Sequence, residues 1–199
     1  GLLRRAQGPD EVIGVLAHEI GHIAGGHLAR LNSELESAST QALLAAILGV
    51  AAGVAAGRAD VGAAVAVGGQ SSAVRGLLAH TRVQESAADQ AAFRFLEATN
   101  RSAQGLVDLL GRLSDQELVS SRYQDPYVRT HPLSRDRLET AKIAVAQEGP
   151  TAQKASAEDR RRFARMQAKL AGFTDPPAAT LDRYTGDDVD SRYARAIAH

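Results

Sequence analysis

Two histidines and a glutamate near the N-terminus have the spacing of a metal-dependent hydrolase site. His18, Glu19 and His22 form the pattern HExxH. On a helix, residues four apart differ by only about 40° around the axis, so both imidazoles project from one face. Two such nitrogens can bind one zinc ion, and the glutamate can take a proton from a metal-held water. The pattern predicts a zinc site with His18 and His22 as ligands and Glu19 as general base; the alternative is an ordinary helix whose histidines face solvent.

A catalytic zinc needs a third protein ligand, and the nearest histidine is poorly placed for it. His27 follows His18 by nine residues, which is half a turn away from the ligand face of a continuous helix. We therefore expect His27 to face solvent or to flank the helix.

Glu85 is the better candidate for the third ligand. It precedes Asp89 by four residues in an alanine-rich segment. At that spacing one carboxylate can bind the metal while the other accepts the free N–H of a ligating imidazole. We expect Glu85 to be the ligand and Asp89 to be the outer carboxylate, with the small Ala87 and Ala88 allowing two helices to approach closely. The alternative is a solvated acidic face.

These residues are positioned by helices, and the fold class expected is mainly α. A proline and two acids at residues 9–11 suit the first turn of a helix that kinks or ends at residues 25–26. Apolar spacing predicts further helices over 83–98, 103–120, from Ser134 to Gln147, and over 152–171, followed by a last helix that runs to the C-terminus. Strand signals are weak throughout.

Composition excludes several classes of function. The 199 residues carry 23 basic and 23 acidic side chains, and this balance disfavours a nucleic-acid partner. The absence of cysteine excludes thiol catalysis, cysteine-ligated zinc and disulfides. The chain opens without a signal segment and stops inside a helical pattern, so we expect it to be a fragment.

A small-residue apolar stretch covers residues 42–69, interrupted by Arg58 and Asp60. A membrane span needs about 20 apolar residues, and residues 42–57 offer sixteen. We expect a hairpin of two helices lying over the cleft, with an integral-membrane protease as the alternative.

Three motifs together resemble a known family. Val15–His22, Glu85–Asp89 and Thr130–Pro132 with Arg137-Leu138 occur in this order. They resemble the gluzincin zinc metallopeptidases of the HtpX, CAAX prenyl protease and BepA (YfgC) family. The His-Pro-x4-Arg element is most similar to the soluble, periplasmic BepA-type branch, and the resemblance covers residues 10–140.

The resemblance implies a site and an organisation. His18, His22 and Glu85 would bind zinc, with Glu19 as general base and Asp89 in support. Residues 1–149 would form a zincin-like metallopeptidase domain whose N-terminal part precedes residue 1. Residues 150–199, after the Gly-Pro pair at 149–150, would be a linker helix and the start of a tetratricopeptide-like helical region. In this branch the missing repeats would engage outer-membrane assembly machinery.

His131 matches a histidine that approaches the zinc in a closed form of that family. From the residues alone, three roles stay open: a loop histidine held extended by Pro132, a fourth ligand that blocks the water, or a cation that stabilises the oxyanion. The function expected is a zinc endopeptidase that hydrolyses misfolded or misassembled proteins in envelope quality control. The rival interpretation is a chaperone or assembly scaffold whose zinc is structural or self-inhibited.

Overall fold

The computed structural model describes residues 2–114, 127, 131–133 and 135–199. The chain forms two compact units, one of residues 1–18 with 92–199 and one of residues 19–91. Within the described ranges the structure is helical, as expected, and the sole β-type pairing is a single bridge between Arg101 and Gln153. The helices are α1 Leu2–Arg5, α2 Pro9–Ala24, α3 His27–Ala56, α4 Ala59–Ala98, α5 Gln104–Ser114, α7 Arg135–Ala146, α8 Ala157–Thr174, α9 Pro177–Arg183 and α10 Val189–Ala198.

The core of the first unit lies where α5 meets the start of α2, the end of α4 and α7. Leu106, Leu109 and Leu110 of α5 are fully buried in it. Gly105 explains the close approach to α2, because a side-chain carbon there would lie 2.2 Å from the backbone carbon of Asp10. Two hydrogen bonds of 2.7 and 2.6 Å from Arg112 to Glu11 join the same two helices. This core holds the first half of α2, including His18, in place.

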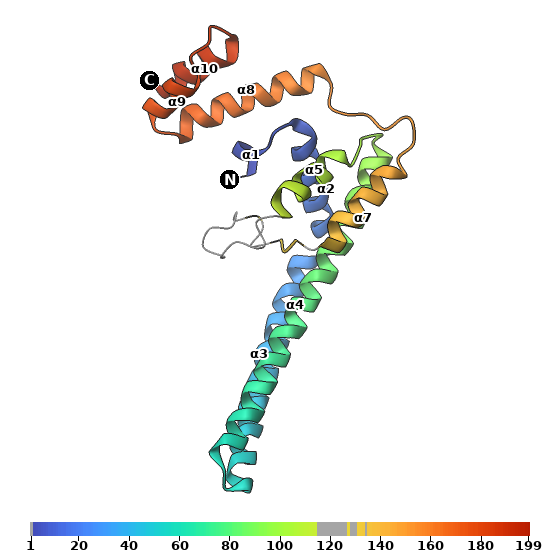
Figure 1. Cartoon of the computed structure of the whole chain (residues 1–199), viewed down its shortest axis with the longest axis vertical. Helices are drawn as coiled ribbons and strands as arrows, with labels where there is room; N and C mark the ends of the chain where they lie inside the picture. The colour runs from blue at the N-terminus through green and yellow to red at the C-terminus, as the bar shows by residue number, and fades with distance from the viewer. Residues whose placement is uncertain (1, 115–126, 128–130, 134) are drawn as a thin grey trace. The chain divides into compact units, whose positions relative to one another are not determined.

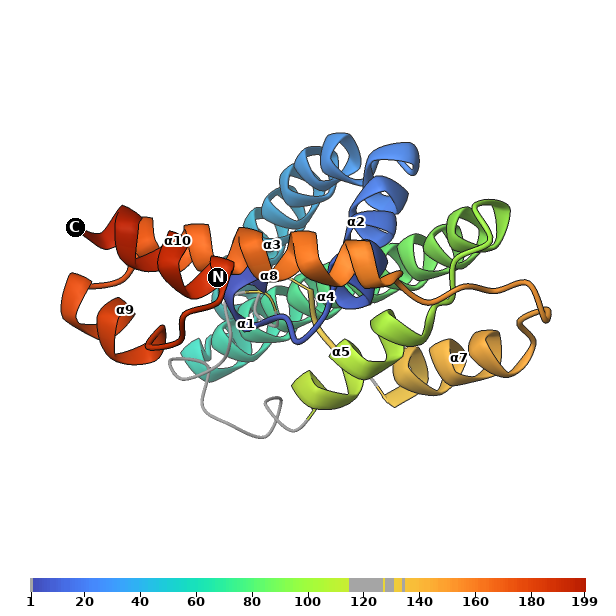
Figure 2. The ribbon, with the colours of Figure 1, turned by 90° about the horizontal axis from the view of Figure 1, so that it is seen from above.

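The C-terminal helices of this unit pack on one another (Figures 1 and 2). Ser156 and Asp159 form a reciprocal capping box, so α8 starts at residue 157, five residues later than the sequence predicted. Gly172 of α8 allows α10 to approach, since a side-chain carbon there would lie 2.7 Å from Cβ of Ile197. Pro177 begins the short helix α9. Residues 150–199 lie in the same compact unit as residues 92–149, and the boundary at 149–150 stays a prediction.

In the second unit α3 and α4 run side by side as a helical hairpin, visible in blue and green in Figure 1. Glycines form the contact, because a side-chain carbon at Gly49 would lie 2.6 Å from the carbonyl oxygen of Gly62. The turn is at Gly57, which has a left-handed φ of 62°. The two helices of the predicted hairpin are present, and their placement over the cleft stays a prediction. The helix expected over 83–98 is the end of the 40-residue α4.

Large aliphatic side chains cover the outside of α3. Leu43, Ile47 and Val54 are exposed, whereas the small residues Ala45 and Gly49 are buried. By length and composition α3 is apolar enough to cross a membrane. Residues 37–41 ahead of the apolar run are uncharged but mostly polar, so the count of sixteen apolar residues at 42–57 stands, and the integral-membrane alternative stays a prediction.

Candidate metal centre

Helix α2 carries the two histidines of the HExxH pattern, as predicted. Its first turn contains Asp10 and Glu11, whose charges suit the N-terminal end of the helix dipole. His18 is fully buried and His22 is half-buried, one turn further along the same helix. The alternative of two solvent-facing histidines is therefore wrong.

A glycine inside the pattern brings α4 against α2. A side-chain carbon on Gly21 would lie 2.6 Å from the carbonyl oxygen of Ala88 and 3.0 Å from its Cα. Ala88 is fully buried, as predicted, whereas Ala87 is exposed and takes no part in the approach. One turn before Ala88, Glu85 is 2% exposed, and its Oε1 lies 3.3 Å from Nε2 of His22. The close backbone contact therefore places the Glu85 carboxylate at the ligand face of α2.

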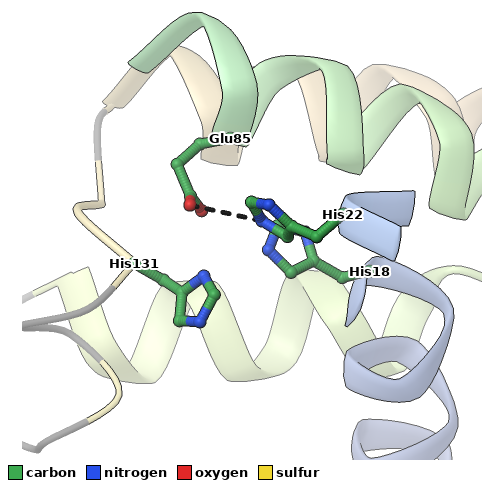
Figure 3. A group of neighbouring side chains, drawn as sticks. All are labelled: His18, His22, Glu85 and His131. Atoms are coloured by element: carbon green, nitrogen blue, oxygen red, sulfur yellow. Dashed lines mark ion pairs between the residues drawn. The ribbon is translucent and has the colours of Figure 1, made fainter. Parts of the chain in front are cut away.

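Four side chains offer their ligand atoms to one point (Figure 3). One atom from each lies within 4.8 Å of the others. The donor set fits zinc, which binds imidazole nitrogen and carboxylate oxygen and prefers four ligands in a tetrahedron. Three of the four are the residues that the sequence predicted as ligands, and the fourth is the histidine whose role was left open; zinc binding by them stays a prediction. The four residues are His18, His22, Glu85 and His131.

The loop that carries His131 is fastened on several sides. The Tyr127 ring stacks on the His131 ring with centroids 4.6 Å apart, and the backbone N–H of His131 donates to the Tyr127 carbonyl. The buried Arg137 donates to the carbonyl of Pro132 at 2.8 Å, and Leu133 inserts into the core. These contacts explain the His-Pro-x4-Arg spacing as an anchor for the loop. No periodic sequence signal indicates Tyr127, and the predicted cap Ser134 and the motif residue Thr130 fall outside the described residues.

The two remaining predicted site residues lie on the same helices. Glu19 is half-buried on α2, directly after His18, and is not one of the four grouped ligands. Asp89 is 2% exposed on α4, one turn after Glu85. A solvated acidic face is therefore wrong for the Glu85–Asp89 pair, while the roles of Glu19 and Asp89 stay predictions.

The prediction for His27 is correct in part, because the residue lies beyond the end of α2 and outside the four grouped ligands. It begins α3, but it is 5% exposed instead of facing solvent. Its Nδ1 lies 2.9 Å from Nδ1 of His22. The helix ends near residues 25–26, as predicted, with α2 stopping at Ala24 and Gly26 in a left-handed φ of 62°. The angular argument for His27 treated the helix as continuous, and the turn at Gly26 is the reason that His27 is buried instead of facing solvent.

Gly21→Ala is expected to weaken zinc binding about tenfold or more and to cost about 1–3 kcal/mol of stability, as overpacking does. The added methyl would meet the α4 backbone, which must move away and carry Glu85 with it. Gly76→Ala, on the facing helix α4, is the control for the same chemical change, because nothing lies within 4 Å of its added carbon. Zinc titration and thermal unfolding of both variants check this; equal zinc affinity in the two would contradict it.

Comparison with known proteins agrees with this geometry. The model of peptidase family M48 matches residues 1–145. A Vibrio cholerae protein with the provisional name beta-barrel assembly-enhancing protease is 30% identical over 194 residues, which cover 96% of this chain and 36% of the relative. Beta-barrel assembly-enhancing proteases of Yersinia pestis and Escherichia coli K12 are 31% and 27% identical over 149 residues, 75% of this chain and 30% of each relative. The chain thus spans about a third of the length of these curated relatives. No solved structure matches significantly.

Proposed function

The chain belongs to peptidase family M48, and from this premise we propose that it is a zinc-dependent endopeptidase. The observation that carries the proposal is the convergence of His18, His22 and Glu85, whose ligand atoms lie within 4.8 Å of one another and of His131. Two histidines and one glutamate are a ligand set of catalytic zinc sites, which keep a further position open. His18, His22 and Glu85 would hold the metal.

The residues around this group can divide the work of peptide hydrolysis. Bound zinc supplies a Lewis acid that polarises the scissile carbonyl and lowers the pKa of a water molecule. Glu19, next to His18 on α2, would take the proton of the attacking water and deliver it to the leaving amine. Asp89, buried one turn from Glu85, would orient a ligand by accepting an imidazole N–H.

We further propose that the substrates are unfolded or misassembled proteins of the cell envelope and that the chain acts in the periplasm. The names of the relatives, which refer to beta-barrel assembly, support this. In the proposed arrangement, residues 1–149 are the protease domain and residues 150–199 begin a helical repeat region that would bind outer-membrane assembly machinery. The exposed aliphatic surface of α3 supports an additional membrane association.

The test of this function is cleavage of an unfolded, casein-type protein by the zinc-loaded chain. The reference is the Glu19→Gln variant at the same zinc content. Cleavage by the wild-type chain alone supports an endopeptidase. Absence of cleavage by both proteins supports the second candidate, an assembly scaffold with a self-inhibited zinc site.

The position of His131 favours a resting state in which the site is closed. Its ligand atom belongs to the group of four, and its ring centroid lies 5.4 Å from that of His18. A neutral imidazole is a good zinc ligand, so His131 would fill the position that the substrate water needs. The anchors at Tyr127 and Arg137 reduce the entropy lost when the loop docks.

His131→Ala is therefore expected to raise basal proteolysis with little loss of zinc. If the resting chain is open about a tenth of the time, removal of the fourth ligand raises the rate about tenfold. Initial rates at matched zinc content measure the effect. A stabilising role toward the oxyanion predicts the opposite sign, a fall in rate, and an unchanged rate would eliminate both roles.

A further inference from the structure

His27 makes a contact that assigns the two ring nitrogens of His22 to different partners. Nδ1 of His27 lies 2.9 Å from Nδ1 of His22, and the two rings meet edge to face at 83° with centroids 4.8 Å apart. The other nitrogen of His22, Nε2, lies 3.3 Å from Oε1 of Glu85 (Figure 3). His22 thus faces the ligand group through Nε2 and His27 through Nδ1.

The backbone before His27 is shaped for this contact. Gly26 has φ 62° and ψ 30°, a left-handed conformation that reverses the chain between α2 and α3. Gly25 leaves room for the returning ring, because a side-chain carbon there would lie 2.4 Å from Nε2 of His27. His27 is 5% exposed. Two consecutive glycines therefore allow a buried imidazole to fold back onto a metal-ligand candidate five residues earlier.

The tautomers follow from the chemistry of a ligating imidazole. A neutral imidazole has one N–H donor and one acceptor nitrogen. A ring that binds a metal through Nε2 keeps its proton on Nδ1, so His22 would donate from Nδ1. His27 must then accept at Nδ1 and carry its own proton on Nε2.

We propose that His27 is a positioning residue, a neutral hydrogen-bond acceptor that holds His22 in its Nδ1-protonated form with Nε2 directed at the metal. The inference rests on the proposed function, in which His22 is a zinc ligand. An outer partner of this kind fixes the orientation of the ligand ring and raises its basicity, and its loss lowers metal affinity about 10–100-fold. In other zinc sites a carboxylate or backbone carbonyl accepts the free N–H of the ligating histidine, and here the His27 imidazole would accept it.

Two substitutions of nearly equal size separate the hydrogen bond from packing. His27→Asn places an amide oxygen close to the position of the imidazole Nδ1, whereas His27→Leu fills the space without an acceptor. Zinc affinity, measured by competition with a chelator, is expected to fall about 10–100-fold in His27→Leu and to recover most of the way in His27→Asn. Thermal unfolding of the metal-free variants reports any loss of fold.

Equal zinc affinity of both variants and the wild-type chain would overturn the proposal. So would an equal loss in both that follows a lowered unfolding temperature, because His27 would then act through packing alone.

Nitrogen-15 NMR tests the same hydrogen bond without zinc, in a Glu85→Ala background that removes the carboxylate competing for the His22 proton at Nε2. In metal-free Glu85→Ala the His22 proton is expected on Nδ1, and this preference should disappear when His27→Leu is added. A His22 proton on Nε2 in Glu85→Ala would overturn the inference. Failure of the wild-type chain to bind zinc, with the Nδ1 tautomer present in Glu85→Ala, would instead count against the proposed function.

Discussion

Glu19→Gln is expected to keep its zinc and to lose about 10²–10⁴-fold in proteolytic rate, the range that a positioned general base contributes. Glutamine has nearly the same size as glutamate, so the half-buried position on α2 can accept it. Its amide cannot take a proton from water, and this is the step assigned to Glu19. The ligand group does not include Glu19, so metal content should remain at the wild-type level.

The measurement is the initial rate of cleavage of an unfolded, casein-type protein at matched zinc content. Glu36→Gln is the control, since it makes the same chemical change at an exposed position on α3. We expect the control to cleave at the wild-type rate. Loss of zinc in Glu19→Gln would assign Glu19 to metal binding instead, and an undiminished rate would refute its role as base.

Glu85→Ala is expected to reduce zinc affinity more than the approximately 100-fold limit typical of an outer partner. Glu85 is 2% exposed, and its Oε1 lies 3.3 Å from Nε2 of His22. A side chain that faces solvent would have to move into this buried position before it could bind the metal in place of Glu85. Zinc that binds only the folded chain stabilises it by about 2.7 kcal/mol at a free concentration of 100 Kd. The variant should lose this zinc-dependent rise in Tm.

Glu97→Ala provides the matched control, because Glu97 lies on the same helix α4 and is exposed. Its zinc affinity and its zinc-dependent Tm shift should equal those of the wild-type chain. If Glu85→Ala binds zinc as tightly as this control, Glu85 is not a ligand, and His131 becomes the third one.

The sequence predicts well those features that depend on helix periodicity. The start of α2 near Pro9, the shared face of His18 and His22, and the burial of Glu85 and Ala88 all follow from residue spacing and small-residue content. Periodicity cannot locate turns within a continuous apolar pattern. For the same reason it does not show where a helix begins inside such a pattern. The prediction therefore started a helix at residue 83, whereas α4 runs unbroken from Ala59.

Other features depend on contacts between distant residues or on one backbone angle. The angular argument placed His27 half a turn from the ligand face, and the positive φ of Gly26 invalidates that argument by ending the helical path. The adjacent glycines were the available signal. The stacking of Tyr127 on His131 and the bond from Arg137 to Pro132 arise from tertiary packing, which spacing alone does not predict.

The central claim is that His18, His22 and Glu85 hold one zinc ion, and anomalous diffraction tests it most directly. Crystals of the zinc-loaded chain should show a single peak in the anomalous difference map at the zinc edge. The peak is expected at a bonding distance of about 2.0–2.2 Å from one atom of each of the three side chains. A peak at another place in the chain, or none at these three residues despite zinc saturation, would contradict the account.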